Sequence, residues 1–428
     1  MKIVIISESF SENMGYADSC LPKYLAMLGH EVHVLTSNTQ VYFNEPFYNE
    51  VYQHFLGPPI TAYGVKQFDR YTIHRLPFEP KNGQMKLLGM FKKLAQIKPD
   101  IVQTFAIDEK TTFQAALYKP LLGYKLFTAN HVVASVFPAA QIKSEEVKKD
   151  IERTAGTNTQ KETIKQKPNK FSLFYLINGV RNRYYRFTTH NYFVNYITHT
   201  CYPATIDASD IAIRFMGVPP SKIKINILGV DTEVFKPTGD NAAFISERKV
   251  LREKHGFSEQ DIVCIYTGRF TEGKNPLCLA RSINKLVEEG KPYRALFIGL
   301  GPQKDAILAS KGCQVLPFMN YKELAQYYRA VDIGVWPKQE STSVLDATAC
   351  GLPVVISDRV LATERKEGNG LTYIENDSED MKNVLLKLES KQYRNELGKL
   401  GIEKINKNQK WADIAKRRVQ DYELALSK

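Results

Sequence analysis

Two cations stand close together in the segment YTGRFTEGKNP, directly after an apolar run typical of a buried strand. Arg269 and Lys274 lie five positions apart in this segment, and Gly268 allows a close approach of the backbone. Arginine offers a planar fork to phosphate oxygens, and lysine offers a point charge. Solvated surface charges are the simpler interpretation of such a pair. The pair indicates a phosphate site only if neighbouring strand ends also carry groups that can bind such a ligand.

A second stretch, VWPKQESTSVLDATACGLPVV, joins two further apolar runs. It predicts a strand, a loop, a short helix that starts at Ser343 and is ended by a glycine, and another strand. Unpaired backbone amides near Ser341, Thr342 and Ser343 favour an anion. Asp346, in the first turn, can accept hydrogen bonds from sugar hydroxyls. The same residues fit an ordinary N-cap with an acid that complements the helix dipole.

A third turn, IGLGP, places Gly299 and Gly301 at another strand end. It does not match the dinucleotide fingerprint, because no third glycine follows at the required spacing and Pro302 intervenes. Three such loops at successive strand ends of one parallel sheet favour a site for a diphosphate and a ribose. The residues themselves thus predict a protein that binds a nucleoside diphosphate.

The elements around these loops predict an α/β protein with two doubly wound, Rossmann-like domains that face a cleft. Strands and helices alternate in both halves, which indicates parallel sheets with helices on both faces. We expect a first domain at 1–235, a second at 236–405 that binds the ligand, and a C-terminal helix at 406–428 that packs or crosses back to the first domain. The predicted elements include the strands KIVIIS, EVHVLTS, DIVQTF, KLFTAN, DIVCIYT, RALFIG, DIGVW, PVVIS and LTYI, a helix over QMKLLGMFKKLAQI, and a last helix with Trp411, Ile414, Ala415, Val419, Tyr422 and Leu424 as its apolar positions.

A basic aromatic segment at 141–190 interrupts the alternation. It contains 11 Lys and Arg against 5 Asp and Glu, a net +6 of the chain's +12. Its core, KFSLFYLINGVRNRYYRF, fits a helix that lies on anionic lipid. A helix that packs its aromatic residues on its own domain explains the same pattern. RNA is a weaker alternative, since no RNA-binding motif accompanies the segment.

Composition limits the classes of protein that fit. Hydrophobic residues make up 43% and charged residues 24% of the 428 residues, as in globular proteins. The sequence contains no apolar run long enough to span a membrane, and we read the N-terminus as a first strand. The six cysteines show no paired or zinc-ligand spacing, so we expect reduced core thiols in a cytoplasmic protein, peripheral on the membrane if the basic segment binds lipid.

Six motifs in order give the chain a resemblance to the retaining glycosyltransferases of the GT-B fold, family 4 (glycosyl transferases group 1). They are GHEVHVLTS, ILGVDTEVF, GRFTEGKNP, ELAQYYRAVDIGVWP, LDATACGLPVV and GNGLTY. The resemblance covers nearly the whole chain apart from the basic aromatic segment. It implies the metal-independent transfer of a sugar from a nucleoside-diphosphate sugar, with UDP or GDP as the leaving group, to a hydroxyl of a lipid or glycan acceptor.

The resemblance also implies roles for individual residues. Arg269 and Lys274 match the pair that holds the donor diphosphate, and fixed cations there stabilise the charge that develops on the leaving group. Gly15 matches a loop that closes over the donor phosphate. His131 matches a histidine that contacts the transferred sugar; a structural imidazole is the alternative for this residue. Asp346 stands where the family places a glutamate on the ribose.

The chain departs from the family at the first of two acidic positions. Counting back eight residues from Asp346 gives Lys338, whereas a loop three residues shorter gives the role to Glu340. We favour Glu340 as the residue that binds the sugar hydroxyls. Leu324 and Tyr328 are candidates for the base pocket, but neither distinguishes the bases. A nucleotide-sugar epimerase of the same fold and a non-catalytic nucleotide-sugar-binding or scaffold protein stay open as alternatives.

Overall fold

The structure is a computed structural model that describes residues 1–81, 84–132, 189–338, 341–360 and 362–428. Residues 141–188 of the basic aromatic segment and Glu340 therefore lie outside its described part. Contacts within the chain define two compact units. The first comprises Met1–Glu8, Pro77–Ile227 and Leu424–Lys428, and the second comprises Ser9–Leu76 and Leu228–Glu423.

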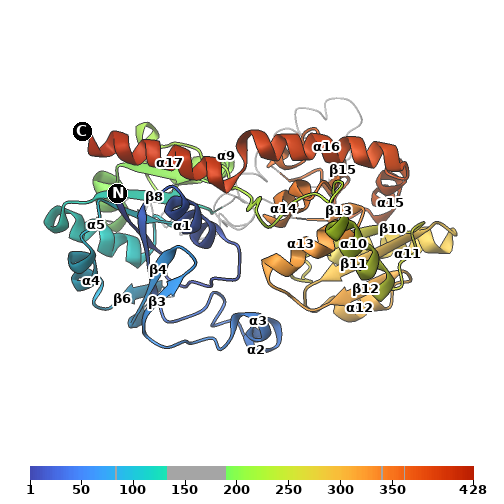
Figure 1. The fold of residues 1–428 in the computed structure, drawn as a ribbon, viewed down its shortest axis with the longest axis horizontal. Helices are drawn as coiled ribbons and strands as arrows, with labels where there is room; N and C mark the ends of the chain where they lie inside the picture. The colour runs from blue at the N-terminus through green and yellow to red at the C-terminus, as the bar shows by residue number, and fades with distance from the viewer. Residues whose placement is uncertain (82–83, 133–188, 339–340, 361) are drawn as a thin grey trace, which may run out of the picture. The chain divides into compact units, whose positions relative to one another are not determined.

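The N-terminal half of the chain forms a seven-stranded sheet with the order β3-β4-β2-β1-β7-β8-β9 (Figure 1). The pairs β2–β4, β1–β7, β7–β8 and β8–β9 are parallel, and β3–β4 is antiparallel. Ile3, Val4, Ile5 and Ile6 are all fully buried, as expected for a parallel strand covered on both faces. The strands are β1 (Lys2–Ile6), β2 (Glu31–Ser37), β3 (Gly64–Phe68), β4 (Tyr71–Leu76), β7 (Ile101–Thr104), β8 (Lys125–Asn130) and β9 (Thr200–Pro203).

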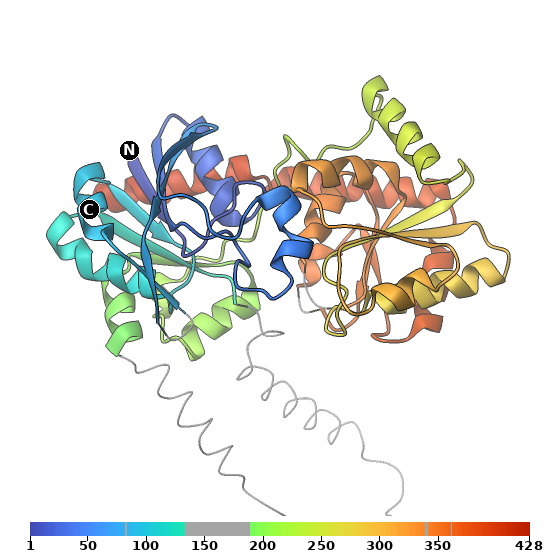
Figure 2. The ribbon, with the colours of Figure 1, turned by 90° about the horizontal axis from the view of Figure 1, so that it is seen from below.

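Helices and a small hairpin connect these strands. The hairpin is the antiparallel pair β5 (Phe78–Lys81) and β6 (Gln84–Leu87). The helices are α1 (Ala17–Met27), α2 (Tyr48–Val51), α3 (Gln53–Leu56), α4 (Met90–Ile97), α5 (Lys110–Leu122), α8 (Thr189–Ile197), α9 (Ile206–Arg214) and the 3-10 turn η2 (Pro220–Lys222). The short helices α2 and α3 stand apart from strands β3 and β4 in both views (Figures 1 and 2).

The C-terminal half forms a six-stranded sheet with the order β12-β11-β10-β13-β14-β15, and all its pairs are parallel. Helices cover both faces of this sheet (Figure 2). Its strands are β10 (Ile262–Thr267), β11 (Tyr293–Ile298), β12 (Cys313–Leu316), β13 (Ile333–Trp336), β14 (Val354–Ser357) and β15 (Gly370–Tyr373). The helices are α10 (Ala242–Lys254), α11 (Pro276–Glu288), α12 (Lys304–Leu308), α13 (Tyr321–Ala330), α14 (Ser343–Ala349), η3 (Thr363–Arg365), α15 (Ser378–Lys387), α16 (Lys391–Asn408) and α17 (Trp411–Leu426).

Two sequence expectations are wrong in detail. The helix expected over 84–97 begins only at Met90, because Met85 and Leu87 are the buried positions of strand β6 and Gly89, at φ 74°, ends that strand before the helix. In the last helix Leu424 is 57% exposed, and Ala425 takes the buried position instead.

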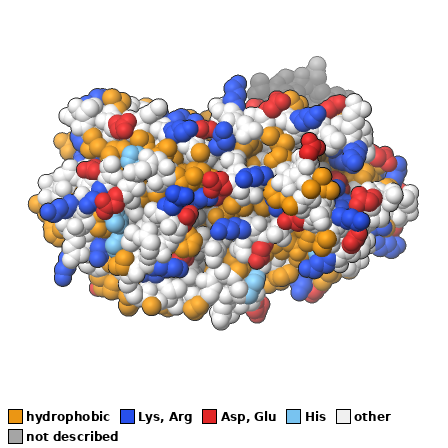
Figure 3. Space-filling view, viewed as in Figure 1, with side chains coloured by type: hydrophobic (Ala, Val, Ile, Leu, Met, Phe, Trp, Pro, Cys, Tyr) orange, Lys and Arg blue, Asp and Glu red, His pale blue; other side chains and the backbone are white. Residues whose placement is uncertain are grey.

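The structure can be compared with what the composition predicts for the cysteines, for membrane-spanning helices and for the positive charge. The six cysteines are free thiols, and five of them are buried. Within the described residues, no helix is long and apolar enough to cross a membrane. Lys and Arg side chains are interspersed with Asp and Glu over the face drawn in Figure 3. The excess of positive charge is therefore not gathered into one patch on that face.

Candidate functional site

The strand order of the second sheet fixes where a ligand is expected. The chain runs from β10 outward to β12 on one side and then returns to β13 on the other side of β10. Ligands of such open sheets bind beside the carboxyl ends of the strands, at the point where this order reverses. In this chain the loops after β10 and β13 flank that point. The sequence predicts a ligand site in both loops: the first carries the two cations, and the second carries the hydroxyls and the acid.

The loop after β10 holds Arg269 by its backbone. Gly268 N–H donates to the carbonyl of Ile298 at 3.0 Å, and Phe270 N–H donates to that of Leu300 at 2.9 Å. The Tyr266 hydroxyl donates to the carbonyl of Arg269 itself at 2.9 Å. These bonds fix the backbone on both sides of Arg269, whose side chain is exposed. A cation on a rigid turn at the ligand edge suits the binding of an anion.

The turn after β11 supports this loop by direct backbone packing. A Cβ on Gly299 would lie 1.9 Å from the carbonyl oxygen of Gly268, and one on Gly301 would lie 2.7 Å from that of Phe270. Both glycines have a φ of +154°, a conformation that other residues rarely adopt. The sequence assigned IGLGP to the ligand, whereas the structure shows that its glycines allow the two loops to meet.

Lys274 ends the same loop. Its backbone N–H and that of Asn275 both donate to the carbonyl of Thr271, at 3.0 and 2.8 Å. Asn275 has φ 47° and is the N-cap of α11, with Pro276 at the first helical position. The half-buried Lys274 is thus carried by a closed turn at a helix start. The structure places Arg269 and Lys274 on one ordered loop, as the sequence predicts; their roles stay predictions.

The loop after β13 leads into α14. Thr342 is the N-cap of this helix but makes no side-chain cap hydrogen bond, so the capping interpretation is not supported by such a bond. The Ser341 carbonyl accepts a hydrogen bond from the buried Arg365. Ser343 is bonded to the hydroxyl of Tyr328, which also lies 2.8 Å from the hydroxyl of Thr267. The hydroxyl-rich loop is therefore tied to the end of β10.

Tyr328 and Leu324 lie on α13. Tyr328 is fully buried, and its hydroxyl joins the end of β10 to the start of α14. Leu324 is half-buried and packs against the hydrophobic core of the second sheet. Both positions can shape the surroundings of a base, and this role stays a prediction.

Asp346 carries the strongest electrostatic perturbation at this edge. Burial, and to a smaller extent the negative charge of Asp231, raise the pKa of Asp346 to about 8. Asp231 accepts hydrogen bonds from the Tyr24 hydroxyl at 2.7 Å and from Lys23 Nζ at 2.9 Å. A carboxyl with such a pKa is largely protonated near neutral pH, so it can both donate to and accept from sugar hydroxyls.

The acidic position that departs from the family pattern is only partly visible. Lys338 is described, and its Nζ lies 4.0 Å from Glu375 Oε1. Glu375 follows β15, and its other oxygen accepts from the Ser357 hydroxyl at 2.8 Å. Glu340 is outside the described residues, so the choice between Lys338 and Glu340 stays open. The structure adds Glu375, which directly follows the apolar run LTYI, a signal that could have identified it.

Gly15 lies before α1, in the second unit. Its φ is +69°, and a Cβ there would lie 2.8 Å from Cγ of Tyr321. Both the backbone conformation and the close contact therefore require glycine at this position. The role over the donor phosphate stays a prediction.

His131 and a second perturbed carboxyl lie in the first unit. His131 follows β8, and its ring packs edge-on against Phe105 with the centroids 5.6 Å apart. Glu8 follows β1 and accepts a hydrogen bond from Met85 N–H at 3.1 Å. Burial raises the pKa of Glu8 to about 7, with a smaller increase from Asp108. Glu8 is not among the residues predicted from the sequence, although its place after the apolar run KIVIIS is a usable signal.

Comparison with known proteins finds a family similarity in the second half of this chain. Residues 261–391 match the sequence model of the family described as glycosyl transferases group 1. This match covers less than a third of the chain. Within its bounds lie Arg269, Lys274 and Asp346.

The curated proteins that are similar to this chain match only parts of it. D-inositol 3-phosphate glycosyltransferase of Mycobacteroides abscessus is 30% identical over 167 residues, which are 35% of this chain and 35% of that protein. Spore coat protein SA of Bacillus subtilis is 25% identical over 230 residues, 47% of this chain and 59% of that protein. The chain thus spans about a third to three fifths of the length of these curated relatives.

Solved structures show the fold of the whole chain. A glycosyltransferase from Rickettsia africae has a TM-score of 0.66 at 13% identity, covering 100% of this chain and 98% of that one. HepE from Anabaena, solved in complex with UDP and glucose, has a TM-score of 0.64 at 14% identity, covering 98% and 99%. Sucrose-phosphate synthase from Thermosynechococcus elongatus has a TM-score of 0.63 at 14% identity, covering 100% of this chain and 99% of that one. The predicted α/β GT-B fold is confirmed.

Proposed function

We propose that this protein is a retaining glycosyltransferase that moves a hexosyl group from a nucleoside-diphosphate sugar to a hydroxyl of an acceptor. One observation carries the proposal: the loop with Arg269 and Lys274 and the loop that leads to Asp346 flank the point where the strand order of the second sheet reverses. The match of this segment to glycosyl transferases group 1 supports it.

The chemistry assigned to each group follows from the charges involved. As the glycosidic bond breaks, negative charge develops on the departing diphosphate, and the two cations stabilise it. Asp346 binds the ribose hydroxyls. The departing phosphate accepts the proton of the acceptor hydroxyl on the same face of the sugar, which retains the anomeric configuration. UDP and GDP are the proposed leaving groups, and the bound UDP in HepE favours UDP.

We further propose that no metal ion takes part. Among the described residues, no cluster of His, Cys, Asp and Glu has a metal-binding arrangement. Arg269 and Lys274 supply the positive charge that a metal would otherwise bring to the diphosphate. His131 is proposed to contact the transferred sugar, and Glu340 its hydroxyls.

The acceptor is proposed to be a lipid or a lipid-linked glycan, reached at the cytoplasmic membrane surface. The net +6 of residues 141–190, mixed with aromatic residues, supports this proposal. Sedimentation with anionic liposomes tests it. A variant that lacks residues 161–187 should lose most of the binding, whereas undiminished binding would show that another surface is responsible.

Two measurements test the proposed function. Thermal stabilisation by UDP, GDP and ADP, with and without a chelator, should show one preferred base, since binding to the folded state raises its stability by about 2.7 kcal/mol at a hundred times Kd. Lys274→Ala should lower the rate of transfer by about 10²–10³, the usual cost of removing one group that stabilises the transition state. Lys311→Ala removes an exposed cation elsewhere on the same unit and should leave the rate unchanged.

Contrary results have distinct meanings. If no nucleotide stabilises the wild-type protein, it is not a nucleotide-sugar enzyme. If sugar is released from the donor equally fast with and without an acceptor, an epimerase or hydrolase replaces the transferase.

A further inference from the structure

A cavity of about 410 Å³ lies at the edge of the first sheet, within the second unit, and its lining residues include neither Arg269 nor Lys274. Its walls come from the loop after β1, from the end of β4 and from the segment that leads into β3. This volume is in the range of small-molecule sites. The proposed mechanism does not use this cavity.

The floor of the cavity contains a buried ion pair. Arg75 Nη2 lies 3.3 Å from Glu12 Oε2, and their side chains are 8% and 11% exposed. Arg75 also donates to the carbonyls of Phe10, Ser37 and Thr39, so its guanidinium is anchored to the ends of β1 and β2. Desolvating two charges is costly. A buried carboxylate on the wall of a cavity therefore marks a candidate ligand site.

Glu12 has capacity left for a ligand. A carboxylate has about four lone-pair sites. Among the described residues, two cations contact Glu12: Arg75 on one oxygen and Lys66 Nζ at 3.2 Å on the other. Two acceptor sites therefore remain, which matches a pair of neighbouring hydroxyls. Lys66, whose side chain is 62% exposed, and the exposed amide of Asn13 supply hydrogen-bond donors at the rim.

Part of the cavity lining is apolar and exposed to solvent. Tyr63 and Val65 are 59% and 61% exposed and both line the cavity. Lys66 Nζ lies 5.4 Å above the ring of Phe68, another lining residue. An aromatic ring beside carboxylate and amide groups suits a molecule with apolar C–H faces and hydroxyl edges. A sugar ring or a cyclic polyol has both.

The cavity is connected to the loop that leads to Gly15. The Ser11 hydroxyl donates to Gln40 Oε1 at 2.6 Å and accepts from Val41 N–H at 3.0 Å. Gln40 Nε2 donates in turn to the Leu56 carbonyl at 2.9 Å. Gln40 and Leu56 line the cavity, and Glu12 stands three residues before Gly15. A ligand in the cavity would thus contact the same loop that the resemblance assigns to the donor phosphate.

We infer that this cavity is a subsite for the acceptor, which binds a sugar or cyclic polyol unit through a pair of neighbouring hydroxyls on Glu12. The inference rests on the proposed transferase function, and it specifies the acceptor as a molecule with a vicinal diol. Lys66 and Asn13 donate to further oxygens of the ring, while Tyr63 packs on its apolar face.

Saturation-transfer NMR on the full-length protein tests the inference directly. Glucose, galactose, N-acetylglucosamine and myo-inositol serve as probes, with 1,3-propanediol as a diol whose hydroxyls are not neighbours. At least one cyclic probe should bind the wild-type protein, and 1,3-propanediol should not. Glu12→Gln should weaken that binding at least tenfold, since a charge-assisted hydrogen bond contributes about 1.5–3 kcal/mol.

A filling variant guards against misfolding of Glu12→Gln. Ala62→Trp puts a large side chain at the cavity wall and leaves the ion pair intact, so it should also abolish probe binding. Gln67→Trp, on the same exposed edge strand but not lining the cavity, is the matched control and should bind like wild type. Undiminished probe binding in Ala62→Trp, or no cyclic probe bound by the wild-type protein, overturns the inference.

Nucleotide binding separates this test from that of the proposed function. All three variants should keep the wild-type thermal shift with the preferred nucleotide. Loss of the nucleotide shift in the wild-type protein would remove the transferase function, whereas intact nucleotide binding without probe binding would remove only the acceptor subsite.

Discussion

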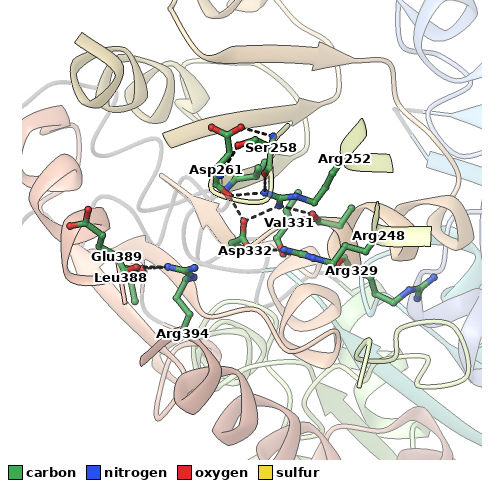
Figure 4. A network of polar contacts seen from close by, with 12 residues as sticks. Arg248, Arg252, Ser258, Asp261, Arg329, Val331, Asp332, Leu388, Glu389 and Arg394 are labelled. Carbon is green, nitrogen blue, oxygen red and sulfur yellow. Dashed lines mark hydrogen bonds and ion pairs between the residues drawn. The ribbon is translucent and has the colours of Figure 1, made fainter. Parts of the chain in front are cut away.

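Two buried arginines, Arg252 and Arg75, make the same kind of contact at opposite edges of parallel sheets. Arg252 donates to the carbonyls of Ser258, Asp261 and Ala330 and pairs with Asp332 at 3.1 Å (Figure 4). Those groups stand just before β10 and β13, at the amino edge of the second sheet. Arg75 bonds the carbonyls that follow β1 and β2, at the carboxyl edge of the first.

The difference lies in what surrounds each arginine. The side chain of Arg252 is 2% exposed, and Arg248 joins the same carboxylate of Asp332 at 2.7 Å. The groups of this network bond to one another and connect α10 to the sheet. The Arg75 pair borders a cavity instead. Because ligands of parallel sheets bind at carboxyl ends, the same chemistry stabilises the fold at one edge and serves a site at the other.

The largest expected effect is from Asp332→Ala. This change leaves Arg248 and Arg252 without their shared carboxylate, and removal of one partner from a buried ion pair costs about 3–5 kcal/mol. Urea denaturation measures the loss in the free energy of unfolding. Asp210→Ala, which breaks the exposed pair with Arg214, should cost less than about 1 kcal/mol. Equal losses in the two variants would show that the network does not fasten the fold.

Gly299→Ala tests how closely the loops at the carboxyl edge of the second sheet are packed, for comparison with its amino edge. The new Cβ would meet the backbone of Gly268 at 1.9 Å, so the loss should be at the upper end of about 1–3 kcal/mol for overpacking. Gly256→Ala is the control, since its φ of +67° brings strain but no atom lies within 4 Å. It should lose about 1–2 kcal/mol. Matching losses would mean that the two loops can separate without penalty.

Arg75→Met should lower the stability less than Asp332→Ala does, and it should weaken acceptor binding. Water in the adjacent cavity can hydrate the carbonyls that Arg75 leaves, so we expect a loss of only about 1–2 kcal/mol. The KM for the acceptor should rise at least tenfold, because Arg75 positions Glu12. A loss as large as that of Asp332→Ala, with an unchanged acceptor KM, would make Arg75 a purely structural residue.

The sequence predicts the strands of both sheets well where burial is continuous, and poorly at the edges. KIVIIS and DIVCIYT are recognisable because covered parallel strands are apolar throughout. Edge strand β3 was missed because Gly64 to Gln67 are all exposed and show no periodic pattern. At the site, Arg269, Lys274 and Asp346 follow recognisable strands. Glu12 and Arg75 stand 63 positions apart and resemble surface charges until the fold pairs them.

Asp346→Asn keeps the shape of the side chain, so its effect should be visible only in the pH dependence of stability. Asp346 has a folded pKa of about 8, against 3.8 for an ordinary aspartate. The protonated form is therefore favoured in the fold, and its stabilisation is fully present below about pH 4 and lost as the pH rises through 8. Asparagine does not titrate. The variant should therefore gain on wild type by up to about 1.4 kcal/mol for each pH unit between pH 5 and pH 8.

Melting temperatures at the two pH values measure this gain. Glu8→Gln, at the carboxyl edge of the first sheet, is the companion variant. Burial raises the pKa of Glu8 from 4.5 to about 7, so the gain has the same sign but should level off near pH 7, below the pH at which that of Asp346→Asn levels off. The two gains should add if the carboxyls titrate independently. Parallel pH profiles for wild type and Asp346→Asn would show that Asp346 is ionised throughout. In that case the ribose would meet a carboxylate that only accepts hydrogen bonds, and the ligand edge of the second sheet would carry one more negative charge than the burial of Asp346 implies.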